Sequence, residues 1–167
     1  RNQTVWKVSG DKFELLAESQ QNDIARIYKM VTLLLGMRPD EHEFKVMGLA
    51  PYAKEAYVAR TMSVIENLLE VNSMQVVHKN RPENLYAYLE ENLKDHRFDN
   101  IAGAVQLYTE QLATQLVDNI AETTGIKRFV ISGGVAMNVK MNKAIGELDA
   151  VEELFVCGSG GDESLCI

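Results

Sequence analysis

The sequence lacks the features that mark several specialised classes of protein. Its two cysteines, Cys157 and Cys166, lie near the end of the chain, which is too few for a disulfide framework, and they lack the CxxC spacing of a zinc site. The longest apolar run, residues 31–35, is interrupted by Thr32 and is far shorter than the roughly 20 residues that span a bilayer. No signal-like apolar segment opens the chain. We therefore expect a cytoplasmic protein with no membrane partner.

Clustered positive charge is also missing. The chain carries 17 Lys and Arg against 24 Asp and Glu, a net charge of −7, and no basic patch. Proteins that bind DNA or RNA by neutralising phosphates need clustered Lys and Arg, so we expect no nucleic-acid partner. The 46% of apolar residues in 167 is enough for one globular domain with a core. The chain starts at Arg1 and stops at Ile167 soon after an apolar segment begins, so we expect a larger parent protein.

The first two thirds of the sequence predict a hairpin followed mainly by helices. Two β-prone runs, residues 4–8 and 13–17, flank turn residues that include Gly10, which predicts a hairpin. Apolar residues recurring every three or four positions predict helices at 23–35, 58–69, 85–89 and 99–124. Gly36 and Gly125 are expected to end the first and the last of these. Residues 37–52 show no period and are expected to form an ordered loop, and 74–78 a short strand.

The last third predicts a different unit. A strand at 128–132 leads into the Gly133-Gly134 turn and a helix at 137–148, and a second strand at 154–157 leads into a second glycine-rich turn at 158–161. Strand, helix and strand within roughly 30 residues are typical of a βαβ unit with parallel strands. Both turns then lie at the carboxyl edge of one sheet, where open α/β sheets bind ligands, and the free N–H groups of the following helices suit a phosphate. The glycines could instead serve close packing of strand and helix.

Five segments, in order, resemble one known family. Residues 131–138 (ISGGVAMN) resemble the GGVAxN adenosine motif of the actin-like ATPase branch that handles carbamoyl-adenylates, and 44–52 (FKVMGLAPY) are similar to the KVMGLAxYG segment of NodU/CmcH-type O-carbamoyltransferases. Residues 27–36, 101–106 (IAGAVQ, similar to IAAAVQ) and 161–164 (GDES) agree with three further segments of that family.

The resemblance implies an α/β fold: a partial actin-like, RNase H-like lobe of the ATPase superfamily, with a mixed sheet and flanking helices. Residues 1–167 would form a single partial nucleotide-binding domain, and a YrdC-like domain absent from this chain would make carbamoyl-adenylate from carbamoyl phosphate and ATP. The actin-like domain would pass the carbamoyl group to a hydroxyl of a sugar or natural-product acceptor. The resemblance leaves open whether the protein forms a homodimer. We expect the 167-residue chain alone to be inactive in transfer, and the sequence assigns no catalytic residue.

Site residues follow from the resemblance position by position. Gly133, Gly134 and Asn138 match residues that line the adenine and ribose of ATP or carbamoyl-adenylate, and Gly160 and Gly161 form the second turn of the same cofactor site.

Asp162 matches the carboxylate that binds a divalent metal, of the iron type or Mg, beside the phosphates. Without the resemblance Asp162 would be interpreted as a helix N-cap. The HxxxH pair of the family's metal site is missing, since His42, His78 and His96 lack that spacing, and we expect those ligands upstream.

Three positions depart from the family pattern. Cys157-Gly158 stands where prolines are usual, Asn100 where Asp is usual and Ala53 where Gly is usual. Lys45 could reach a phosphate as a point charge, but an exposed lysine is more often solvated, so the sequence leaves the role of Lys45 open.

Three alternatives remain. One is the sister enzyme that transfers threonylcarbamoyl to tRNA, which shares GGVAxN but should lack the segment at 44–52. The others are a non-catalytic ATP-binding domain and a carbohydrate kinase of the same superfamily. The acceptor cannot be named from these residues.

Overall fold

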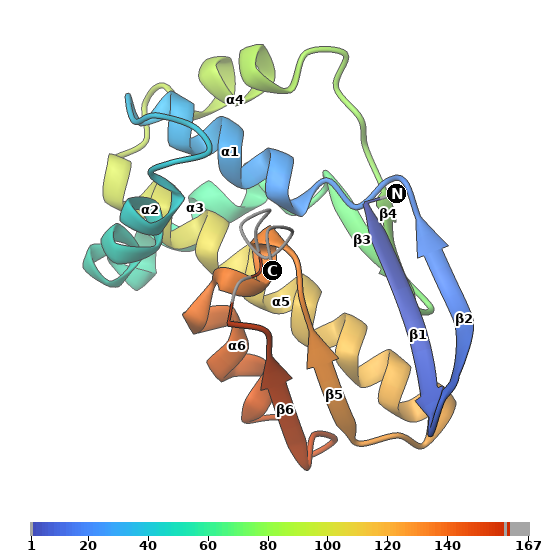
Figure 1. Ribbon diagram of the computed structural model, residues 1–167. Helices are drawn as coiled ribbons and strands as arrows, with labels where there is room; N and C mark the ends of the chain where they lie inside the picture. Colours follow the sequence, from blue (N-terminus) through green and yellow to red (C-terminus); the bar gives the residue numbers. More distant parts are fainter. Residues whose placement is uncertain (1, 159, 161–167) are drawn as a thin grey trace.

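A single long helix, α5 (Phe98–Thr124), organises the computed structural model, which describes residues 2–158 and 160 (Figure 1). The N-terminal half of α5 supplies Ile101, Val105 and Tyr108 to the larger hydrophobic core, which the other helices of the first two thirds share. Its C-terminal half supplies Ala113 and Val117 to a smaller core at the end of the chain. The helix therefore joins the two cores, and the fold is a mixture of helices and small sheets.

The elements agree with the sequence prediction in most of the chain, with additional elements at 43–52 and 69–72. They are β1 (Gln3–Ser9), β2 (Lys12–Ser19), α1 (Ile24–Leu34), α2 (Glu43–Leu49), the 3-10 turn η1 (Ala50–Tyr52), α3 (Glu55–Ile65), β3 (Leu69–Asn72), β4 (Gln75–His78), α4 (Leu85–Leu93), α5, β5 (Arg128–Ile131), η2 (Gly134–Met137), α6 (Val139–Gly146) and β6 (Glu153–Val156). The predicted hairpin and the predicted helix stops are confirmed: Gly36 and Gly125 adopt φ of 74° and 68°, which glycine accepts without strain. Within the described residues, no helix is both long and apolar enough to cross a membrane.

The expected loop at 37–52 is wrong in its second half. Residues 43–52 form α2 and η1, and Val46 is fully buried in the larger core. A helix of seven residues is too short to show a clear apolar period, and Gly48 and Pro51 disguise it further. Burial of Val46, rather than helix propensity, stabilises this turn of helix.

The second helix ends earlier than its apolar spacing predicts. Leu69 lies in β3 and not on α3, and its backbone N–H and carbonyl both bond to the hydroxyl of Tyr108, at 2.8 and 2.9 Å. Burial raises the pKa of Tyr108 to about 12, so the hydroxyl keeps the proton that it donates. A contact 39 residues distant along the chain therefore helps to hold Leu69 in the strand.

The expected mixed sheet is also wrong. Within residues 2–158 and 160 the strands form three separate two-stranded sheets: β1–β2 and β3–β4 are antiparallel, and β5–β6 is parallel. A short turn joins the two strands of each antiparallel sheet, so each strand pairs with its neighbour in the sequence. Helix α5 packs on both β3–β4 and the core beneath β5–β6, which keeps those two sheets apart. Whether the lobe is actin-like stays a prediction.

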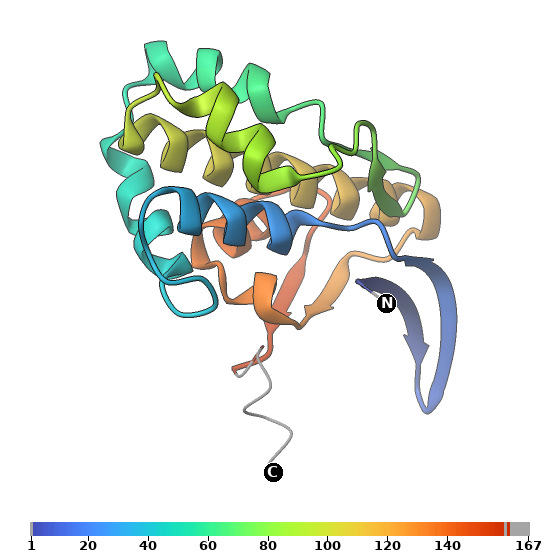
Figure 2. The ribbon, with the colours of Figure 1, turned by 90° about the horizontal axis from the view of Figure 1, so that it is seen from above.

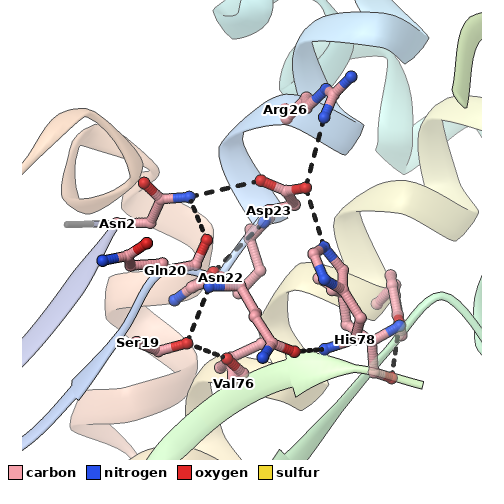
Figure 3. Close-up of polar contacts among 12 residues, drawn as sticks. Asn2, Ser19, Gln20, Asn22, Asp23, Arg26, Val76 and His78 are labelled. Atoms are coloured by element: carbon pink, nitrogen blue, oxygen red, sulfur yellow. Dashed lines mark hydrogen bonds and ion pairs between the residues drawn. The ribbon is translucent and has the colours of Figure 1, made fainter. Parts of the chain in front are cut away.

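Polar contacts fasten the N-terminal hairpin, which projects from the helical body (Figure 2), to the start of α1 and to β4 (Figure 3). The Ser19 hydroxyl donates to the Val76 carbonyl at 2.8 Å, and Nε2 of His78 lies 3.0 Å from the Asp23 carboxylate. The side chains of His78 and Asp23 are only 14% and 17% exposed. His78 therefore has a structural role, since its ring nitrogen is paired with Asp23.

The beginning of α5 carries a buried carboxylate. Asp99 accepts two hydrogen bonds from Arg97, at 3.1 and 2.9 Å, and one from the backbone N–H of Asn100. The hydrogen bonds from Arg97, together with the bond from Asn100, hold the pKa of Asp99 below its usual range despite its burial.

We expect Asp99→Asn to reduce the pH dependence of stability in acid. Because the folded-state pKa is depressed, the stabilisation from Asp99 is present above its unfolded-state pKa, about 3.9, and is lost as the pH falls through the folded-state pKa. Melting temperatures between pH 6 and pH 2 should therefore fall less steeply in the variant than in the wild type. The exposed Asp149→Asn is the matched control, and equal slopes for all three proteins would contradict the assignment.

Candidate functional site

The two glycine-rich turns of the last third lie against each other. Strands β5 and β6 pair in parallel from Arg128–Glu153 to Ile131–Val156, so both turns leave the same edge of the sheet, as predicted. A Cβ atom built on Gly160 would lie 2.6 Å from the Gly133 carbonyl oxygen and 3.2 Å from Cγ of Met137. The close approach of the turns therefore depends on glycine at position 160.

A pocket of about 890 Å³ opens beside these turns. Helix α1 and residues at the start of α2 form one side of it, and Gly133, Gly134, Asn138 and Gly160 lie on the other. Its size is within the range of ordinary small-molecule sites, about 300–1,000 Å³. Four of the six residues predicted for the site are thus brought together in one cavity. Gly161 and Asp162 lie outside the described residues, so their placement stays a prediction.

The three glycines of the pocket differ in why glycine is present. Gly133 has φ 106° and ψ 164°, a conformation that other residues rarely adopt, whereas Gly160 is required by the contact just described. Gly134 has neither constraint: its φ lies outside the left-handed region, and no described atom lies within 4 Å of the Cβ position. Backbone geometry alone therefore leaves the absence of a side chain at 134 unexplained.

Asn138 is held by a partly buried network of hydrogen bonds that was not predicted from the sequence. Its Oδ1 accepts the Met141 backbone N–H at 3.0 Å and caps α6, and its amide pairs with the amide of Gln106 through two bonds of 3.0 and 2.9 Å. Gln106 also accepts from the Tyr28 hydroxyl at 2.9 Å and donates to Glu110 at 2.7 Å. Helices α1, α5 and α6 thus meet at this amide pair. The available signal was Gln106 itself, the last residue of the segment at 101–106.

Charged side chains line the α1 side of the pocket. Lys29 pairs with Asp40 at 2.5 Å and Arg26 lies 3.7 Å from Asp23, so both cations are already compensated by carboxylates. Lys45 is exposed, lies 5.8 Å from the ring centre of Phe44 and is not among the described residues that line the pocket. The structure thus gives Lys45 no role at the pocket.

Comparison with known proteins identifies the family. The family described as Carbamoyltransferase N-terminus matches residues 3–167. The chain belongs to this carbamoyltransferase family.

Several curated proteins resemble the chain over a limited part of their length. An uncharacterized protein of Methanocaldococcus jannaschii is 29% identical over 165 residues, which cover 94% of this chain and 31% of that protein. An uncharacterized protein of Synechocystis is 23% identical, with 84% and 25% covered, and nodulation protein NolNO of Sinorhizobium fredii is 26% identical, with 89% and 22% covered. The chain therefore spans less than a third of these relatives.

Ala53, one of the three departures from the family pattern, packs against Gly103 of α5. Ala53 stands where the family usually has glycine, and Gly103 stands within IAGAVQ where the similar segment IAAAVQ has alanine. A Cβ atom at Gly103 would lie only 2.4 Å from the Cβ of Ala53. Glycine at 103 therefore leaves the space that the Ala53 methyl group occupies. Asn100, another of the three departures, accepts the Lys54 backbone N–H at 3.2 Å and so fastens the same two segments.

The described histidines do not form a metal centre for this carbamoyltransferase domain. His42 accepts the Arg38 backbone N–H, His78 pairs with Asp23, and His96 bonds to the Thr61 hydroxyl at 2.8 Å. Between residues 2 and 158 and at 160, no three His, Cys, Asp or Glu side chains gather so as to hold a metal ion.

Proposed function

We propose that the chain is the nucleotide-binding part of an ATP-dependent O-carbamoyltransferase, in which the pocket beside the glycine turns holds carbamoyl-adenylate. The observation that carries the proposal is the meeting of Gly133, Gly134, Asn138 and Gly160 in one cavity, in a chain of the carbamoyltransferase family. The acceptor would be a hydroxyl of a sugar or natural product, and carbamoyl phosphate would enter through another domain of the parent protein.

The transfer would exchange one carbon–oxygen bond for another. The acceptor hydroxyl oxygen bonds to the carbamoyl carbon, the bond from that carbon to the phosphate oxygen breaks, and AMP leaves with the electron pair. The hydroxyl proton passes to a base that the described residues do not identify. Backbone N–H groups at the glycine turns would bind the phosphate or the developing negative charge, as helix N-termini and turns do elsewhere.

The proposed metal rests on sequence position alone. The described residues do not fit a metal site by themselves. Asp162 follows Gly160 by two residues, and Gly160 lines the pocket, which is why Asp162 remains our candidate ligand for a divalent cation. A carboxylate is the type of ligand that hard divalent cations prefer.

The proposed activity predicts products that separate it from its rivals. The full-length protein, given ATP, carbamoyl phosphate labelled in the carbamoyl carbon and a panel of hydroxyl compounds, should form AMP and pyrophosphate and label an acceptor. A carbohydrate kinase would instead form ADP, and a threonylcarbamoyl enzyme would label tRNA in the presence of threonine. ATP binding without any labelled product would support a non-catalytic domain and contradict the proposal.

Asp162→Asn in the full-length protein is expected to abolish most transfer while leaving the melting temperature unchanged. A neutral amide binds divalent cations poorly, whereas Asn caps a helix about as well as Asp does. Metal content and transfer rate should therefore fall together. Normal activity with full metal occupancy would remove Asp162 from the site.

A further inference from the structure

We propose that Gln106 is a positioning residue that fixes the amide of Asn138 so that Asn138 can offer a bound ligand only a hydrogen-bond donor. The inference rests on the proposed nucleotide site and deepens it. Gln106 is 3% exposed and is not among the described residues that line the pocket, whereas Asn138 is. Any influence of Gln106 on the ligand therefore passes through Asn138.

The orientation of the Asn138 amide is set from one side by the backbone. The Met141 N–H can only donate, so the Asn138 atom 3.0 Å from it must be the oxygen Oδ1. The nitrogen Nδ2 then points to the Gln106 oxygen at 2.9 Å, and Oδ1 accepts from the Gln106 nitrogen at 3.0 Å. This assignment requires the Gln106 oxygen to lie toward Nδ2.

The orientation of Gln106 is set independently from the opposite side. The Glu110 carboxylate accepts from the Gln106 nitrogen at 2.7 Å, and the Tyr28 hydroxyl donates to the Gln106 oxygen at 2.9 Å. Burial, with nearby Glu110 and Glu43, raises the pKa of Tyr28, so this hydroxyl stays protonated and remains a donor. Both ends of the network thus require the same arrangement of the amide pair.

The network leaves Asn138 with one unused group. Its oxygen has two lone pairs, and these are taken by Gln106 and by the Met141 N–H. Its nitrogen has two N–H bonds, of which one is donated to Gln106. Among contacts within the described residues the second N–H is free, and Asn138 borders the pocket. Asn138 is therefore specific for a ligand atom that accepts a hydrogen bond.

The test compares ATP with analogues that each lack one acceptor: 2′-deoxy-ATP, 3′-deoxy-ATP, 3-deaza-ATP and 7-deaza-ATP. We expect one analogue to bind wild-type full-length protein about 10-fold more weakly than ATP, the usual effect of one hydrogen bond. In Gln106→Met the ratio of the affinity for ATP to the affinity for this analogue should fall toward 1, because the amide of Asn138 is no longer held by Gln106. Gln111→Met, an exposed substitution of the same type on the same helix, should preserve it.

Two further variants keep the test decisive if Gln106→Met does not fold. Gln106→Asn retains an amide but is one methylene too short to pair with Asn138, and it should also lose the discrimination. Asn138→Asp keeps the oxygen acceptor that caps α6 and removes the N–H donor. This variant should therefore also bind ATP and the analogue with similar affinity. If Gln106 had a purely structural role, its substitution would weaken the binding of ATP and of all the analogues equally, and every affinity ratio would be preserved. That result would overturn this inference and leave the proposed function standing. If wild-type protein does not bind ATP, the proposed function and this inference both fall.

Discussion

Gly103→Ala is expected to destabilise the protein by about 1–3 kcal/mol, the usual cost of overpacking a well-filled interior. The new methyl would lie 2.4 Å from Cβ of Ala53, 3.4 Å from Cγ2 of Val58 and 3.5 Å from the Ala50 carbonyl oxygen. The first of these distances is well inside van der Waals contact, so α5 or η1 must move. A loss of stability in Gly103→Ala would be informative, because alanine normally stabilises a helix interior by roughly 1 kcal/mol relative to glycine.

Ala53→Gly in the same molecule should restore most of that loss. The double variant exchanges the two methyl groups and recreates the pairing of the family pattern, with glycine at 53 and alanine at 103. Urea unfolding of the wild type, both single variants and the double variant forms a double-mutant cycle, and we expect a coupling free energy of about 1–3 kcal/mol between the two positions. Additive effects would show that positions 53 and 103 are not packed against each other as the structure has them.

The elements that the sequence predicted correctly are those with a local cause. Helix α5 has an apolar period sustained over 27 residues and a left-handed glycine cap at Gly125, and the β5–α6–β6 unit has its turns marked by paired glycines. Helix α2 and strand β3 have no such cause. Val46 and Leu69 adopt their structures because of burial and a hydrogen bond to Tyr108, and neither contact is visible in a local window of sequence.

The same distinction separates the parts of the candidate site. Gly133 and Gly160 were predicted because turns between parallel strands and helices call for glycine, and the structure places both at the pocket. The pairing of Gln106 with Asn138, 32 residues apart, and the close contact between Gly103 and Ala53 were not predicted. Each is a contact between segments whose spatial relation only the fold defines.

The second large effect is expected at the glycine turns, and two of the three substitutions there should damage the fold itself. Gly133→Ala would place a side chain at φ 106°, which costs of order 1–3 kcal/mol. Gly160→Ala would place Cβ 2.6 Å from the Gly133 carbonyl oxygen, and a backbone atom cannot rotate away. Both variants should therefore lose stability and ligand binding together, so neither can report on the ligand alone.

Gly134→Ala separates the two effects. Its Cβ would have no described neighbour within 4 Å and its φ lies outside the left-handed region, so we expect an unchanged or slightly higher melting temperature. Gly134 nevertheless lines the pocket, and a ligand that bonds to the backbone of this turn would meet the new methyl group. Calorimetric titration should therefore give an ATP affinity at least about 10-fold lower, a loss of about 1.4 kcal/mol or more.

The matched control is Gly158→Ala. This glycine has equally open space around its Cβ position but is not among the described residues that line the pocket, so both stability and affinity should be retained. If Gly134→Ala binds ATP as tightly as the wild type does, the nucleotide does not approach this turn, and the glycines serve only the packing of strand against helix. A loss of affinity at 134 with none at 158 would instead require the ligand to lie against the turn between β5 and η2, because the protein itself offers the added methyl group no other contact.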